Sequence, residues 1–67
     1  MKLSPKKIEI LKLIANGYTD KEIAAKLKMS KRTVQTHISL IVSILNARNR
    51  THAVALFMSV HTRWRIQ

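Results

Sequence analysis

The stretch Ser30–Asn46, SKRTVQTHISLIVSILN, decides the fold because it carries one helical pattern without Gly or Pro. Ser30 can cap the start of a helix, since its hydroxyl accepts a hydrogen bond from an otherwise unpaired backbone N–H. Successive residues of a helix are turned by roughly 100°. This rotation brings apolar side chains onto one stripe: Val34, Ile38, Ile41 and Leu45. The stretch therefore predicts a helix over about residues 31–46 with one buried face.

The opposite face of this expected helix is polar and contains no acidic residue. Its side chains are Arg32, Gln35, Thr36, Ser39, Ser43 and Asn46. A solvated helix face usually mixes acidic and basic residues, so a polar face without acids favours a polyanion as its partner. We interpret this helix as a DNA-recognition helix.

The charge of the whole chain points in the same direction. Thirteen Lys and Arg residues against three acidic residues give a formal net charge of +10. Nothing between Ile23 and Gln67 is negative. Such a field attracts phosphate, and the release of condensed counterions favours association. The charge therefore favours nucleic-acid binding; the alternative is that the charge serves only to keep the protein soluble.

Length and composition exclude several other classes. A chain of 67 residues forms one small domain, 1–67, with a core that helix packing and self-association have to stabilise. There is no Cys, so disulfides and thiolate metal sites are excluded. No apolar run approaches the roughly 18 residues of a membrane span, and the N-terminus has no secretory signal. We expect a cytoplasmic protein that does not contact membranes.

The N-terminal part of the chain predicts a first helix over about residues 5–16. Ser4 is a suitable N-cap, and Pro5 suits the first helical position, where its missing N–H costs nothing. Gly17 can adopt the left-handed conformation that ends a helix.

A second, short helix is expected over about residues 20–28. Thr19 and Glu22 have the spacing of a capping box, in which each side chain pairs with the backbone N–H of the other residue. Asp20 and Glu22 lie at the positive end of this helix, which gives them a structural role.

The connection between the second and third helices is only Lys28-Met29-Ser30. So short a link forces the two helices to cross, with Met29 as a core residue at the corner. This is the arrangement of a helix-turn-helix.

A fourth helix is expected over about residues 50–62, with Asn49 as its N-cap. Its apolar side chains cover an arc of roughly 260°, more than one small core accommodates. We expect the additional face to be buried in a twofold dimer; the alternative is a thicker core or a tail that packs over it. The residues expected at the dimer interface are Val54, Phe57, Met58, His61 and Trp64.

Residues 3–57 closely resemble the LuxR-type (GerE-type) helix-turn-helix DNA-binding domain. The matching pieces stand in order at the family's spacing: Leu3-Ser4-Pro5, Glu9-Ile10-Leu11, Gly17-x-Thr19-x-Lys21-Glu22-Ile23-Ala24, Ser30-x-x-Thr33-Val34-x-x-His37, Ile41, Leu45 and Arg50-x-x-Ala53-Val54. The resemblance implies an all-α, four-helix fold with the third helix in the major groove and the fourth helix at the dimer contact. It implies a sequence-specific transcription regulator that binds double-stranded DNA as a homodimer on a pseudo-palindromic site.

The resemblance also implies which residues contact DNA. Base contacts are expected from Gln35, Thr36, Ser39 and Arg32, and phosphate contacts from Lys21, Ser30, Lys31, Thr33 and His37. Physically, the Gln35 amide could pair with adenine N6 and N7, and the Thr36 methyl could meet a thymine methyl.

The chain departs from the family's usual pattern at three positions. A cation is usual where Gln35 stands, an acid is common at Lys7, and Lys is common at Ile44. Ile44 would enlarge a protein interface. Because Met1 precedes the pattern by only two residues, the chain is either a stand-alone regulator or a piece of a longer one.

Two other functions compete with this one. An antagonist that pairs with another LuxR-type regulator through its fourth helix is the main alternative. A sigma-factor or RNA-binding role is the third possible function, although the Arg50-x-x-Ala53-Val54 piece argues against it. An enzyme is not expected, because His37, His52 and His61 form no helical metal pair and no nucleophile–base set is evident. We therefore expect no metal, no cofactor and no small-molecule ligand.

Overall fold

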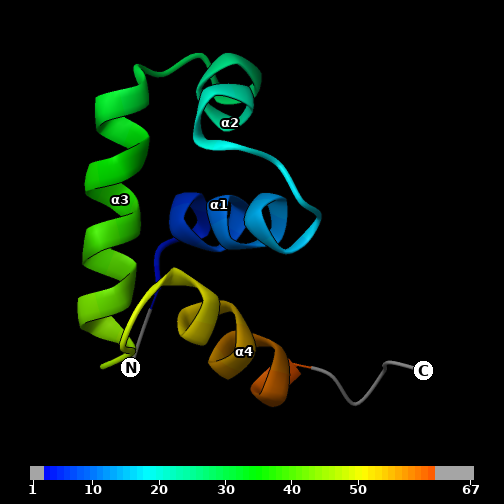
Figure 1. The fold of residues 1–67 in the computed structure, drawn as a ribbon, viewed down its shortest axis with the longest axis vertical. Helices are drawn as coiled ribbons and strands as arrows, with labels where there is room; N and C mark the ends of the chain where they lie inside the picture. The colour runs from blue at the N-terminus through cyan, green and yellow to red at the C-terminus, as the bar shows by residue number, and fades with distance from the viewer. Residues whose placement is uncertain (1–2, 62–67) are drawn as a thin grey trace.

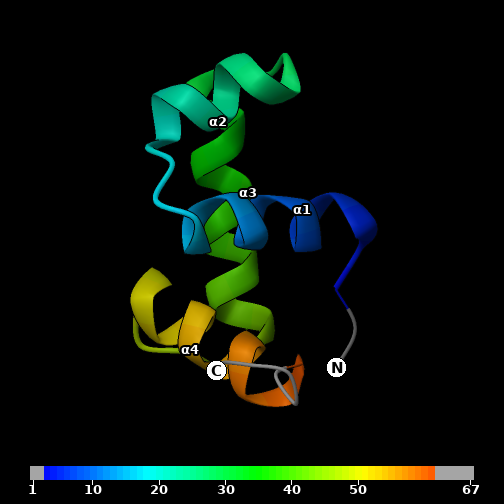
Figure 2. The same ribbon diagram turned by 90° about the vertical axis from the view of Figure 1, so that its right-hand side faces the viewer.

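The computed structural model describes residues 3–61, with side chains as far as Ser59. All regular elements in this range are helices: α1 (Pro5–Ala15), α2 (Asp20–Leu27), α3 (Lys31–Ile44) and α4 (Arg50–His61). The long helix α3 runs along one side of the molecule, and the other three pack against it one after another, α2 at one end, α1 in the middle and α4 at the other end (Figures 1 and 2). The predicted all-α helix-turn-helix architecture is therefore confirmed.

Each helix begins at a side chain that pairs with backbone N–H groups of its first turn. The capping residues are those that the sequence predicted, Ser4, Thr19, Ser30 and Asn49. Thr19 and Glu22 form the expected capping box, with N–H···O distances of 2.8 and 3.1 Å. These caps depend on residues three positions apart, which is why the sequence alone reveals them.

The helices end slightly earlier than predicted. The predicted ends at residues 16, 28 and 46 are corrected to Ala15, Leu27 and Ile44. Asn46 cannot continue α3 because it adopts a left-handed conformation, with φ of 55°. Gly17 is left-handed as expected, with φ of 91°. The predicted last residue of the fourth helix, 62, lies outside the described residues.

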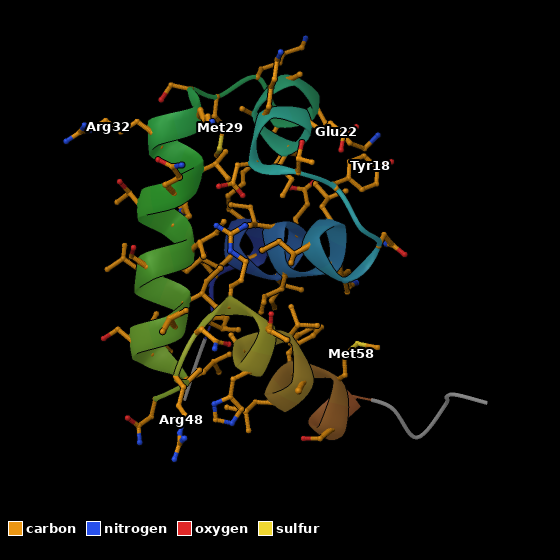
Figure 3. All side chains as sticks on the ribbon, in the orientation of Figure 1. Tyr18, Glu22, Met29, Arg32, Arg48 and Met58 are labelled. Atoms are coloured by element: carbon orange, nitrogen blue, oxygen red, sulfur yellow. The ribbon has the colours of Figure 1, made fainter. Side chains whose placement is uncertain are left out.

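The core combines buried side chains from all four helices: Ile10, Leu11, Leu13, Ile23, Ala24, Val34, Ile38, Ile41, Ala53 and Phe57. The stripe predicted on α3 is thus directed inward, with Leu45 partly buried beside it. Met29 packs against the core in the corner between α2 and α3, as expected (Figure 3).

One assignment on α4 has to be corrected. Phe57 was expected at a dimer interface, but its side chain is only 7% exposed and belongs to the core of its own protomer. Val54 and Met58 are half-buried and pack partly against the same core. The side chain of His61 and the whole of Trp64, both also expected at the interface, lie outside the described residues.

Candidate nucleic-acid interface

The polar face of α3 is open to solvent over its length. Arg32, Gln35, Thr36, Ser39 and Ser43 are all exposed. Arg32 points away from the body of the domain, on the side of α3 opposite the other helices (Figure 3). No described part of the chain covers this face, so a helix that enters a DNA groove could present it to the bases.

Two of the four base-contact candidates interact with each other. The Thr36 hydroxyl donates a hydrogen bond of 3.1 Å to the backbone carbonyl of Arg32, one turn earlier. Because the Thr36 hydroxyl is already paired with a carbonyl of its own helix, the group that this side chain offers to a partner is its methyl group. The geometry is compatible with the thymine contact expected for Thr36.

Gln35 contacts a charged pair that the sequence analysis did not identify. Its amide nitrogen Nε2 donates to Asp20 Oδ2 over 3.4 Å. The Asp20 carboxylate also accepts two hydrogen bonds from Arg50, at 2.5 and 3.1 Å. These contacts join residues 15 and 30 positions apart. Their separation leaves no local pattern by which the sequence could have shown them.

The phosphate-contact candidates lie around the start of α2 and α3. Lys21, Lys31 and Thr33 are exposed. The Ser30 hydroxyl accepts from the backbone N–H of Thr33 at 3.0 Å and donates to its hydroxyl at 2.8 Å. The Ser30 hydroxyl therefore serves as the cap of α3. A phosphate contact by Ser30 would have to come from its backbone N–H.

His37, the remaining phosphate-contact candidate, is half-buried and touches α1. Its Nδ1 lies 3.2 Å from the Lys7 ammonium nitrogen. Burial, and then the charges of Lys7 and Lys6, lower the pKa of His37 below its usual value. An ammonium group only donates, so Nδ1 accepts and the ring proton of the neutral imidazole resides on Nε2. Lys7 thus contributes to the lowered pKa of His37 and accounts for its tautomer.

Two larger apolar side chains are exposed next to the polar face. Leu40 and Ile44, one turn apart on α3, are 47% and 36% exposed.

Within the described range, no group of three or more His, Cys, Asp or Glu side chains could hold a metal ion. In the same range, no helix combines the length and apolar character needed to cross a membrane.

Comparisons with known proteins identify the family of the chain. Residues 1–57 match the family model GerE, described as bacterial regulatory proteins of the luxR family. The chain is 46% identical over 52 residues to the response regulator protein VraR of Staphylococcus aureus, and equally similar to the proteins of that name from Staphylococcus saprophyticus and Staphylococcus epidermidis. The matched region covers 78% of this chain and 25% of each relative. The chain thus spans about a quarter of the length of the curated relatives that it matches.

Proposed function

The chain belongs to the LuxR family of bacterial regulatory proteins, and we propose that it regulates transcription by inserting α3 into the major groove of specific double-stranded DNA sites. The observation that carries this proposal is the exposed polar face of α3 between Arg32 and Ser43, which has no acidic residue of its own. The excess of 13 basic over 3 acidic residues supplies a field that attracts the phosphate backbone.

In this proposal the contacts divide into two groups. Arg32, Gln35, Thr36 and Ser39 read base edges, whereas Lys21, Ser30, Lys31, Thr33 and His37 position the domain on phosphates. The protein acts in the cytoplasm, needs no cofactor and has no catalytic activity of its own.

We further propose that two protomers pair through α4. Val54 and Met58 pack only partly against the core and remain partly exposed. Ala55 beside them is exposed, and no further helix in the described range covers this face of α4. A twofold pair of protomers would place two recognition helices on a pseudo-palindrome with half-sites roughly 10 bp apart.

The proposal is tested by selecting bound duplexes from a random library and inspecting the enriched motif for twofold symmetry. Gln35→Ala should then lower affinity by about 1–3 kcal/mol and change the preference at one base pair. Lys21→Ala should weaken binding to all sequences alike. It should also reduce the slope of log affinity against log salt concentration by about one. Lys12→Ala is a matched control, because Lys12 is an exposed lysine of α1 and is not among the candidate contact residues around α2 and α3. Equal losses on every sequence for the Gln35 variant would refute the base contact.

A second candidate function is favoured by the exposed pair Leu40 and Ile44, since adjacent apolar side chains suit a protein partner. The chain would then be an antagonist that pairs with another LuxR-type regulator and blocks it. The same binding experiment separates the two functions. Failure to retain any complex with random duplex at low salt would support the antagonist.

A further inference from the structure

One carboxylate connects three helices at the edge of the polar face of α3. Asp20 is the first residue of α2, and its side chain is 13% exposed. Both of its oxygens accept from Arg50, the first residue of α4, and Oδ2 also accepts from Gln35 of α3 over 3.4 Å. A residue expected only to stabilise a helix end therefore contacts a residue expected to read DNA.

The ionisation of Asp20 determines how the Gln35 amide is oriented. The hydrogen bond from Arg50 holds the pKa of Asp20 below its usual value, and the hydrogen bond from Gln35 and the charge of Lys31 lower this pKa further. An ionised carboxylate can only accept hydrogen bonds. Gln35 must therefore direct its NH₂ group, and not its carbonyl oxygen, toward Asp20.

An amide held in this way presents a defined pair of groups to a base. One N–H is taken by Asp20, so the carbonyl oxygen and the second N–H remain. These two groups match the N6 donor and the N7 acceptor of adenine in the major groove. Guanine offers two acceptors, O6 and N7, and its O6 would face the amide oxygen of Gln35. A freely rotating glutamine could turn over and donate to guanine instead.

We propose that Asp20, held by Arg50, is a positioning residue that orients the Gln35 amide and thereby makes this chain prefer adenine over guanine at one position of its DNA site. This inference rests on the proposed function and adds the residues that set its specificity. Arg50 has a second effect, because pairing neutralises a carboxylate that would otherwise repel phosphates and could itself accept from cytosine N4.

The test compares Asp20→Asn with the matched control Glu22→Gln. Both variants remove one negative charge from the first turn of α2, but Glu22 pairs with Thr19 and not with Gln35. Affinity is measured for duplexes that differ only at the base pair where Gln35→Ala changes the preference. We expect Asp20→Asn to reduce the adenine-over-guanine discrimination about fivefold or more, while affinity for random duplex stays the same or rises. Glu22→Gln should leave the discrimination unchanged.

Two further measurements separate positioning from general stability. In the Gln35→Ala background, Asp20→Asn should have no effect on discrimination, since the residue on which it acts is gone. Arg50→Lys keeps the charge but loses the bidentate geometry, so its discrimination should lie between those of the unaltered protein and Asp20→Asn. It also provides a test if Asp20→Asn folds poorly.

A measurement without DNA makes the outcomes distinguishable. In the free protein, Asp20→Asn should move the side-chain NH₂ signals of Gln35 in ¹H–¹⁵N spectra, and Glu22→Gln should not. If Gln35→Ala alters no base preference, the base-reading part of the proposed function fails. If Gln35→Ala alters it and Asp20→Asn does not, the present inference is overturned while the proposed function stands. Unmoved Gln35 signals would overturn the contact itself.

Discussion

Replacing Phe57 with Ala should destabilise each protomer by about 3–5 kcal/mol, the usual loss when a buried phenylalanine is truncated. The magnitude follows from the position of the ring, which is 7% exposed in a core shared by all four helices. At roughly 0.05–0.15 kcal/mol per residue, a domain of 67 residues has only about 3–10 kcal/mol of net stability. The variant should therefore lose a large part of its stability.

The assay is urea unfolding followed by circular dichroism at two protein concentrations at least tenfold apart. A loss that arises inside the protomer is the same at both concentrations, whereas a loss at a dimer interface depends on concentration. Leu40→Ala is the matched control, because it also removes apolar atoms but from a side chain that is 47% exposed. Its free energy of unfolding should change by no more than about 0.5 kcal/mol. Sucrose can restore a native baseline if the Phe57 variant is largely unfolded.

Two results would refute this reasoning. A stability loss for Phe57→Ala that disappears on dilution would mean that the ring is buried between protomers, as the apolar arc of the fourth helix first suggested. A loss of several kcal/mol for Leu40→Ala would mean that this exposed part of α3 is covered in solution.

Three other predictions concern local contacts. Lys7→Met should raise the pKa of His37 only part of the way to its usual 6.5, because burial, the larger cause of the lowered pKa, remains. A pH titration of the imidazole ring by NMR measures this pKa, and an unchanged value would contradict the contact between Lys7 and His37. Because this lowered pKa makes the unfolded chain bind more protons just below pH 6.5, the free energy of unfolding should fall as the pH drops through that window, and His37→Gln should flatten the dependence in urea titrations. Ser30→Ala should cost about 1 kcal/mol by removing the cap of α3, seen as a fall in Tm of about 4–8 °C. In contrast, Ser30→Asp should keep most of the stability, and an equal loss for both variants would exclude capping as the cause.

Much of the fold could be predicted because its determinants are local. Ser30 caps α3 through a residue three positions away, and the buried residues Val34, Ile38 and Ile41 follow helical periodicity. Both patterns lie within one or two turns of a helix, where backbone geometry alone decides which side chains are neighbours. The exposed polar face of α3 follows from the same periodicity, so its candidate residues could be chosen before any packing was known.

The remaining features depend on how the helices cross. The pairing of Asp20 with Gln35 and Arg50, and of Lys7 with His37, joins side chains 15 or 30 positions apart. Likewise, the apolar arc of α4 did not show that Phe57 faces the protomer's own core, because a helix with apolar residues on most sides has no preferred inward direction. The amino-acid sequence by itself determined the helices, their caps and the polar face of α3, since these obey short-range geometry. Only the tertiary structure decided which charged side chains meet at that face and which apolar face of α4 is buried, because both depend on where separate helices contact one another.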